Sequence, residues 1–249
     1  MAVMIKGVFF DLYDTLIITG EKTASGWISE FYSCLREHGL SISKEEFTDR
    51  CHGFFSNAEP VRRNDSLTVY ERRIEALCTG LGVGIDTDGI RRTATKTINA
   101  ANSNCYPDPE CHPVLGTLYR QKTLALITNY DHSPYIKAVL RKHDLEKYFK
   151  TIVISEEAGI KKPEPGIFKL ALKKTGLKPG EVVYVGDSIA DDVAGAISAG
   201  ITPVLIKRAA SVENSLSPVF RDDFQASQNP QTQDYRVIRK LSKLLEIFE

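Results

Sequence analysis

Residues 3–11 of the chain read VMIKGVFFD, a run of β-branched and aromatic residues that ends at an aspartate. A short apolar run that stops at a polar residue is typical of a buried β-strand. Four later runs have the same character and lie at residues 124–127, 151–154, 182–185 and 201–206. Segments with helical periodicity separate these later runs, and such alternation predicts parallel strands joined by right-handed crossovers. The sequence therefore predicts an α/β fold, a doubly wound parallel sheet, which a helix at residues 237–248 is expected to close.

A long segment with a different pattern separates the first of these strands from the others. Over most of it, apolar residues recur three and four positions apart, as on one face of a helix, and no clear strand occurs. Asp88 is expected to cap the last helix of this segment. We therefore expect an α/β core of residues 1–17 and 106–249 that is interrupted by a helical cap of residues 18–105.

The composition is that of an ordinary globular protein. The 249 residues contain 32 lysines and arginines against 32 aspartates and glutamates, so the formal net charge is zero. A neutral chain does not favour a polyanionic partner such as a nucleic acid, and no apolar run approaches the roughly 20 residues of a membrane span. Five cysteines without a CxxC pair or a secretion signal indicate reduced thiols. We expect a cytoplasmic protein that binds neither nucleic acid nor membranes.

Polar residues follow three of the predicted strands at the point where each strand ends. Asp11 follows the first strand, Thr128 and Asn129 follow the strand at 124–127, and Asp187 follows the strand at 182–185. Open parallel sheets bind their ligands beyond the carboxyl ends of the strands. We therefore expect these side chains to lie around one site.

Four segments, in this order, resemble the four motifs of the haloacid dehalogenase (HAD) superfamily. They are FFDLYDTL at 9–16, ITN at 127–129, GIKKPEPGIF at 159–168 and VGDSIADD at 185–192. Each lies after a predicted strand or in the segment that follows it. The resemblance implies a Rossmann-like core with an inserted helical cap and a hydrolase whose nucleophile is Asp11.

The side chains of these motifs have the chemistry that hydrolysis of a phosphorylated molecule requires. Asp11 is a carboxylate that can attack phosphorus, and Lys162 adds a fixed positive charge beside it. Thr128 can donate a hydrogen bond to a phosphoryl oxygen. These three residues are the predicted catalytic group, and Thr15 and Asn129 are the candidates for substrate binding.

An anionic nucleophile and an anionic substrate repel each other, so a cation has to neutralise both. Asp11, Asp187 and the backbone carbonyl of Tyr13 offer hard oxygen ligands suited to Mg²⁺. Asp192 could complete the coordination directly or through water. The resemblance makes Asp187 the main acidic ligand. We expect Mg²⁺ as the cofactor and a small anionic molecule as the substrate.

One position departs from the pattern of the family's phosphatases. These commonly carry an aspartate two residues after the nucleophile, which protonates the leaving oxygen and then activates water, but this chain carries Tyr13 there. A phenol with a pKa of about 10 is a weak general acid at neutral pH. Asp14 follows one residue later and points to the opposite side of an extended segment, unless the turn reorients it.

Three functions therefore remain open. The first is a Mg²⁺-dependent phosphatase of small phosphorylated metabolites, which rests on Asp187 and Lys162. The second is a metal-independent L-2-haloacid dehalogenase, because those family members resemble this chain at Tyr13, although their fourth motif resembles SSNxxD and lacks Asp187. The third is a catalytically weak binding protein that keeps the fold.

Three arginine pairs lie in the predicted cap: Arg62-Arg63, Arg72-Arg73 and Arg91-Arg92. Because most arginine side chains are exposed, each pair is expected on a solvated helix face. One of them could instead hold an anionic part of the substrate.

Overall fold

The computed structural model describes residues 4–20, 23–60, 66–208 and 235–248. The chain divides into two compact units. Among the described residues, 4–18, 106–208 and 235–248 belong to the first unit, and the rest of the described residues belong to the second.

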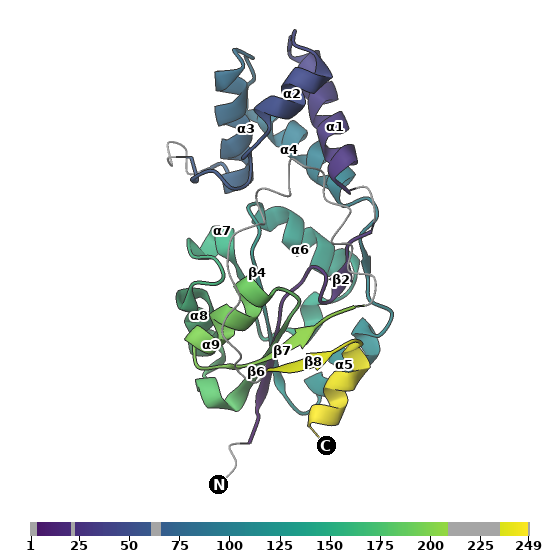
Figure 1. Cartoon of the computed structure of the whole chain (residues 1–249), viewed down its shortest axis with the longest axis vertical. Coiled ribbons are helices and arrows are strands. Elements are labelled where there is room, and N and C mark those ends of the chain that lie inside the picture. The colour runs from purple at the N-terminus through teal and green to yellow at the C-terminus, as the bar shows by residue number, and fades with distance from the viewer. Residues whose placement is uncertain (1–3, 21–22, 61–65, 209–234, 249) are drawn as a thin grey trace. The chain divides into compact units, whose positions relative to one another are not determined.

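A six-stranded parallel sheet forms the centre of the first unit (Figure 1). Its strands lie in the order β5 (Thr151–Ile154), β4 (Thr123–Thr128), β1 (Gly7–Phe10), β6 (Val182–Gly186), β7 (Thr202–Ile206) and β8 (Arg236–Ile238). Neighbouring strands are parallel throughout. Because β1 pairs with both β4 and β6, the chain winds outward from it in both directions. The predicted α/β class with a doubly wound sheet is confirmed.

Helices cover both faces of this sheet, with α8 and α9 on one side and α5 on the other (Figure 1). The described residues of this unit form the helices α5 (Cys111–Tyr119), α6 (Ser133–Lys142), α7 (Ser155–Ala158), α8 (Pro165–Thr175), α9 (Ala194–Ser198), the 3-10 helices η1 (Glu146–Tyr148), η2 (Pro179–Glu181) and η4 (Leu241–Ile247), and the π-helix η3 (Ile189–Val193). Phe9, Tyr184 and Phe168 belong to one buried cluster between the sheet and α8. A separate antiparallel pair joins β2 (Ile17–Ile18) to β3 (Tyr106–Pro107).

The expected closing helix at residues 237–248 is only partly correct. Val237 and Ile238 extend the sheet as part of β8, which pairs with β7. The helical part starts later, as the 3-10 helix η4, which buries Leu241 and Leu244. Pairing with an open strand edge outweighs local helical pattern here, because tertiary context overrides propensity.

The described part of the second unit contains four helices: α1 (Thr23–Glu37), α2 (Lys44–Arg50), α3 (Val69–Gly80) and α4 (Thr87–Ala101). Its core is aromatic, since Trp27 packs against Phe31 and Phe54 and donates a hydrogen bond to the hydroxyl of Tyr70 at 2.6 Å. Among the described residues, none of the helices in either unit combines the length and apolar character of a membrane span.

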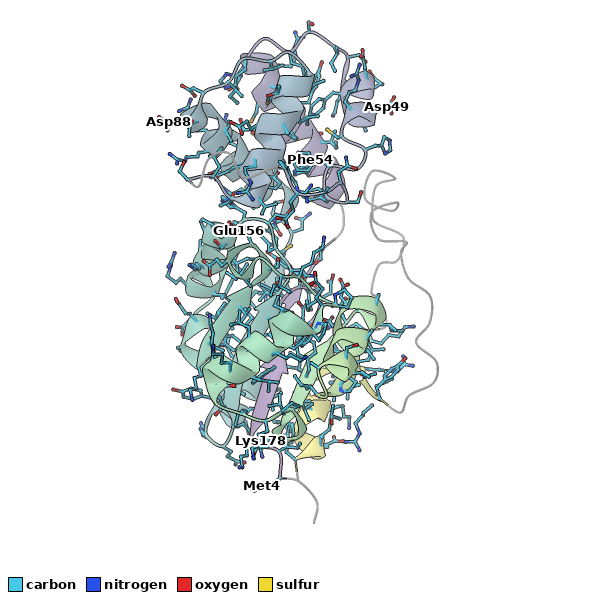
Figure 2. All side chains as sticks on the ribbon, turned by 90° about the vertical axis from the view of Figure 1, so that its left-hand side faces the viewer. Met4, Asp49, Phe54, Asp88, Glu156 and Lys178 are labelled. Carbon is cyan, nitrogen blue, oxygen red and sulfur yellow. The ribbon has the colours of Figure 1, made fainter. Side chains whose placement is uncertain are left out.

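The cap of α4 differs from the prediction. Asp86 caps this helix, because its Oδ1 accepts the N–H of Gly89 at 2.7 Å. Asp88 lies in the first turn instead, at the surface of the helical unit (Figure 2). Its negative charge there still favours the helix N-terminus.

The expectation of solvated arginine pairs is wrong for Arg72 and Arg73, which are both buried. Their guanidinium groups donate to backbone carbonyls of their own unit, from Arg72 to Leu67 at 2.7 Å and from Arg73 to Asn57 at 2.9 Å. These bonds hold the backbone at Asn57 and at Leu67. Arg91 and Arg92 are exposed as expected, and Arg62-Arg63 lies outside the described residues.

Candidate active site

The carboxyl edge of the parallel sheet gathers most of the predicted site residues. Asp11 directly follows β1, Thr128 is the last residue of β4, and Asp187 directly follows β6. In Figure 2, Glu156 lies at this end of the unit, and Met4 and Lys178 lie together at the opposite, amino-terminal end. The parallel direction of the strands therefore brings together residues that are far apart in the sequence.

Three carboxylates converge at this edge. Asp11, Asp187 and Asp192 each offer one oxygen atom, and these oxygen atoms lie within 4.8 Å of one another. Asp11 and Asp192 are buried, whereas Asp187 is exposed. A cluster of carboxylate oxygens of this size matches the ligand preference of a hard divalent cation such as Mg²⁺.

Lys162 lies against two of these carboxylates. Its Nζ is 2.5 Å from Oδ1 of Asp11 and 2.7 Å from Oδ1 of Asp192, and its side chain is 4% exposed. Burial opposes the charge of the ammonium group, but the two carboxylates outweigh burial and raise the pKa of Lys162 above its ordinary value. The side chain is therefore a fixed cation beside Asp11.

One ammonium group does not neutralise three carboxylates. Burial is the largest cause that raises the pKa of Asp11 to about 7; Lys162 opposes this rise and the charge of Asp192 adds to it. Loss of hydration also raises the pKa of Asp187 to about 8, although this residue is exposed, and the charges of Asp11, Asp192 and Asp14 add to the effect. Ionisation of all three carboxylates would leave an excess of negative charge beside one ammonium group, and a bound divalent cation would neutralise it, so the residues present fit such a cation.

Asp192 is held in place by more than Lys162. Its Oδ1 also accepts the hydroxyl of Tyr184 at 2.9 Å, and its Oδ2 accepts the backbone N–H of Ser188 at 3.0 Å. A β-carbon at Gly186 would lie 2.3 Å from the carboxyl carbon of Asp192, so only glycine allows this close approach. The π-helix η3 that carries Asp192 is a feature often found at functional sites.

The side chain of Asn129 bonds to the backbone of the Lys162 loop. Its Oδ1 accepts the N–H of Lys162 at 2.8 Å, and its Nδ2 donates to the carbonyl of Lys162 at 3.0 Å. An amide that satisfies both polar groups of one residue fixes the position of that residue. Asn129 therefore orients Lys162, a function that the sequence pattern did not indicate.

The two predicted threonines are also buried at this edge. Thr128 is 1% exposed, at the end of β4. Thr15 is fully buried, and its Oγ1 makes no hydrogen bond within the described part of the chain. A buried hydroxyl without a partner is uncommon, so Thr15 is suited to a polar contact with a bound molecule or water.

Tyr13 lies in an aromatic stack. Its ring stacks on that of Tyr130, with the ring centroids 5.8 Å apart, and Tyr130 stacks on Tyr135 at the same separation. The next residue, Asp14, has a left-handed backbone with φ of 54°, so the chain turns sharply here. Asp14 is near enough to Asp187 to raise its pKa.

Tyr184 is a site residue that the sequence analysis missed. Its hydroxyl accepts a hydrogen bond from Nζ of Lys162 at 3.2 Å and donates one to Asp192. The side chain is fully buried. A tyrosine within an apolar strand has the sequence signature of a packing residue, and the sequence of the strand does not show that its hydroxyl contacts Lys162.

Comparisons with known proteins agree with these motifs. The sequence profile of the haloacid dehalogenase-like hydrolases matches residues 5–200. A glyceraldehyde 3-phosphate phosphatase of Pyrococcus furiosus is 36% identical over 246 residues, which cover 98% of this chain and 93% of that protein. A solved HAD phosphatase from Thermococcus onnurineus has a TM-score of 0.62 and 25% identity, and the match covers 98% of this chain and 97% of the other. A solved 2-haloacid dehalogenase from Pseudomonas syringae has the same TM-score and identity and 98% coverage of both chains.

Proposed function

The chain belongs to the haloacid dehalogenase-like hydrolases, and we propose that it hydrolyses small phosphorylated metabolites with Asp11 as the nucleophile and Mg²⁺ as the cofactor. The observation that carries this proposal is the cluster of Asp11, Asp187 and Asp192, in which Asp11 and Asp192 contact the buried ammonium group of Lys162. Such a cluster holds a nucleophilic carboxylate next to positive charge at the edge where parallel sheets bind ligands.

The proposed reaction has two steps. A carboxylate oxygen of Asp11 attacks phosphorus, the bond from phosphorus to the leaving oxygen breaks, and an acyl phosphate forms on Asp11. Water then attacks the same phosphorus, the bond from phosphorus to the Asp11 oxygen breaks, and phosphate and the free carboxylate result. The proton that this water loses balances the proton that the leaving oxygen takes up from solvent in the first step. Lys162 orients Asp11 throughout and stabilises the negative charge that develops beside it. Thr128, with Thr15 and Asn129, is proposed to contact the phosphoryl oxygens or to hold the groups that do.

Asp11, Asp187 and the carbonyl of Tyr13 are the proposed ligands of Mg²⁺. When bound, the cation supplies the positive charge that lets an anionic carboxylate approach an anionic phosphate. Asp192 already accepts hydrogen bonds from Lys162, Tyr184 and Ser188, so we propose that it reaches the cation through water.

Tyr13 limits which phosphates are good substrates. Without an aspartate at this position, the leaving oxygen has no strong general acid, and the expected rate loss is on the order of 10²–10⁴-fold for a poor leaving group. Acyl and aryl phosphates leave without that help and are expected to react faster. The relative from Pyrococcus furiosus is named for glyceraldehyde 3-phosphate, which makes this small phosphate the first candidate to test. We place the enzyme in the cytoplasm, where such metabolites occur.

The test is a panel of phosphate esters and acyl phosphates, including glyceraldehyde 3-phosphate, assayed with Mg²⁺ and again with EDTA. We expect Mg²⁺-dependent release of phosphate by the wild type and a loss of at least about 10³-fold in Asp11→Asn, because the amide is not a nucleophile. A wild-type protein that releases no phosphate from any substrate and binds no Mg²⁺ would contradict the proposal.

Tyr13 and the similarity to the Pseudomonas syringae protein support a second candidate, a metal-independent 2-haloacid dehalogenase. Chloride released from 2-chloropropionate in the presence of EDTA would establish that function. The exposed carboxylate of Asp187 argues against it, because a haloacid substrate is itself an anion. If neither phosphate nor halide is released, a binding protein with the same fold becomes the better explanation.

A further inference from the structure

Arg208 lies two residues after β7 and bonds to a segment almost two hundred positions earlier in the chain. Its Nη2 donates to the carbonyl of Thr15 at 2.8 Å, and its Nη1 donates to the carbonyl of Asp14. The same guanidinium group pairs with Oδ2 of Asp108, at 2.6 Å from Nη2 and 3.2 Å from Nε. One side chain therefore joins the end of β7, the turn after β1 and the segment after β3.

Asp108 holds the same turn from a second direction. Its backbone N–H donates to the carbonyl of Leu16 at 2.9 Å, and its Oδ1 accepts the N–H of Glu110 at 2.7 Å. The side chains of Arg208 and Asp108 are only 17% and 8% exposed. A paired, mostly buried guanidinium group with several acceptors is geometrically specific and not a solvated surface contact.

The turn that receives these bonds is tight. The N–H groups of Leu16 and Ile17 both donate to the carbonyl of Leu12 at 2.8 Å. Asp14 lies inside this turn with φ of 54°, a conformation that non-glycine residues rarely adopt. Such a conformation persists only where the surroundings hold it, and the bonds from Arg208 to the two neighbouring carbonyls supply that restraint.

We propose that Arg208 is a positioning residue for the active site. By holding the carbonyls of Asp14 and Thr15, it fixes the turn that carries Tyr13, whose backbone carbonyl is the proposed metal ligand beside Asp11 and Asp187. This inference rests on the proposed function, because it gives the Tyr13 carbonyl the role of a metal ligand. The groups behind metal ligands affect affinity or activity by about 10–100-fold when they are removed.

The variants separate this role from general stabilisation. Arg208→Lys keeps the positive charge but lacks the planar guanidinium group, whose several donors bond to two carbonyls and a carboxylate at once. Arg208→Ala removes the group and allows rescue by added guanidinium. Lys207→Met is the matched control, because Lys207 is the exposed neighbour in sequence.

Three measurements are made on each variant: affinity for Mg²⁺ by calorimetry, kcat and KM on the best phosphate substrate, and hydrogen exchange of the peptide that covers residues 12–17. Both Arg208 variants are expected to lose about 10–100-fold in Mg²⁺ affinity and kcat with KM changed less than threefold. Exchange in this peptide should accelerate on the order of tenfold while exchange in β4 and β6 stays unchanged. Guanidinium should restore part of kcat in Arg208→Ala and none in the control.

Unchanged exchange at residues 12–17 would overturn the proposed restraint, whatever the enzyme's activity. Faster exchange with unchanged Mg²⁺ affinity and kcat would overturn the positioning role. A wild-type protein that binds no Mg²⁺ and releases no phosphate would instead contradict the proposed function, and this result is seen before any variant is compared. If Arg208→Ala does not fold, Arg208→Lys and Asp108→Asn carry the same comparison.

Discussion

The ammonium group of Lys162 lies 2.5 Å from Oδ1 of Asp11, in a position where both side chains are almost fully buried. The two residues are 151 positions apart and come from different loops. Buried ion pairs of this kind give little net stability, because desolvation offsets most of their attraction. The pair is therefore better explained by chemistry than by stability: it orients a carboxylate and keeps positive charge beside it.

Removal of that positive charge should abolish most activity. For Lys162→Met we expect kcat to fall on the order of 10²–10³-fold, because a fixed electrostatic contact to the reacting groups is lost. The free energy of unfolding should fall by about 3–5 kcal/mol, since buried carboxylates lose their partner. Lys161→Met is the control, because Lys161 is the exposed preceding residue. Equal effects of the two substitutions would refute this role of Lys162.

A substitution of Asn129 distinguishes two possible roles of this side chain, substrate binding and orientation of Lys162. The sequence predicts contact with substrate, whereas its side chain bonds to the backbone of Lys162. If orientation of Lys162 is its role, Asn129→Ala should lower kcat about 10–100-fold with little change in KM. The control is Asn102→Ala, which removes a hydrogen bond from a side-chain amide to the backbone carbonyl of Ile98 in the helical unit. A large rise in KM with kcat unchanged would favour direct substrate binding instead.

Much of this site follows from the sequence because of sheet geometry. Asp11 and Asp187 each end an apolar run, and parallel strands place such ends at one edge. The cap of α4 was assigned to Asp88 and is Asp86, because both are good N-cap residues and only the start of the helix selects one. The closing segment at residues 237–248 was predicted as a helix because its own sequence does not show that part of it pairs with β7.

Contacts between side chains that are far apart in the sequence could not be predicted from the sequence pattern. Arg208 and Asp108 are separated by 100 positions, and neither stands in a recognisable motif. The hydroxyl of Tyr184 contacts Lys162, which lies outside the strands and 22 positions earlier in the chain, and the sequence of β6 gives no sign of this contact. The local sequence pattern predicts which face of a helix or strand is apolar, but not which polar side-chain groups of different elements form hydrogen bonds with each other.

Metal binding should change the effect of pH on stability. The pKa of Asp187 is about 8 in the folded chain against an ordinary value of 3.8, so the folded state binds this proton more tightly than the unfolded state. Without Mg²⁺, the stability that the protonated form contributes is present below about pH 4 and is lost as pH rises through about 8. Asp187→Asn has no such proton, so at pH 8.5 without metal it should melt at a higher temperature than the wild type.

With Mg²⁺ at pH 8.5, the wild type should instead melt at a higher temperature than Asp187→Asn. At a hundredfold excess over Kd, binding to the folded state adds about 2.7 kcal/mol, which corresponds to a rise in Tm of roughly 5–10 °C for a chain of this size. The wild type should show this rise at pH 8.5 and much less of it at pH 5, where protons compete for the carboxylates. Asp187→Asn should show little rise at either pH. The same rise in both proteins would argue against Asp187 as a ligand.

The last prediction concerns Tyr13, which stands where the family's phosphatases commonly carry an aspartate. Tyr13→Asp restores a carboxyl group two residues after Asp11, and a general acid accelerates release of a poor leaving group by about 10²–10⁴-fold. We expect kcat to rise on alkyl phosphates and to change little on aryl or acyl phosphates, whose leaving groups need no proton. Tyr13→Asn is the control, because it removes the ring stacked on Tyr130 and has the shape of aspartate without its acidity. A gain in both variants would mean that the ring obstructs the site, and a loss in both would mean that the aromatic stack itself supports catalysis. Only a gain confined to the aspartate, and to substrates with poor leaving groups, identifies the missing acid as the limit on this enzyme.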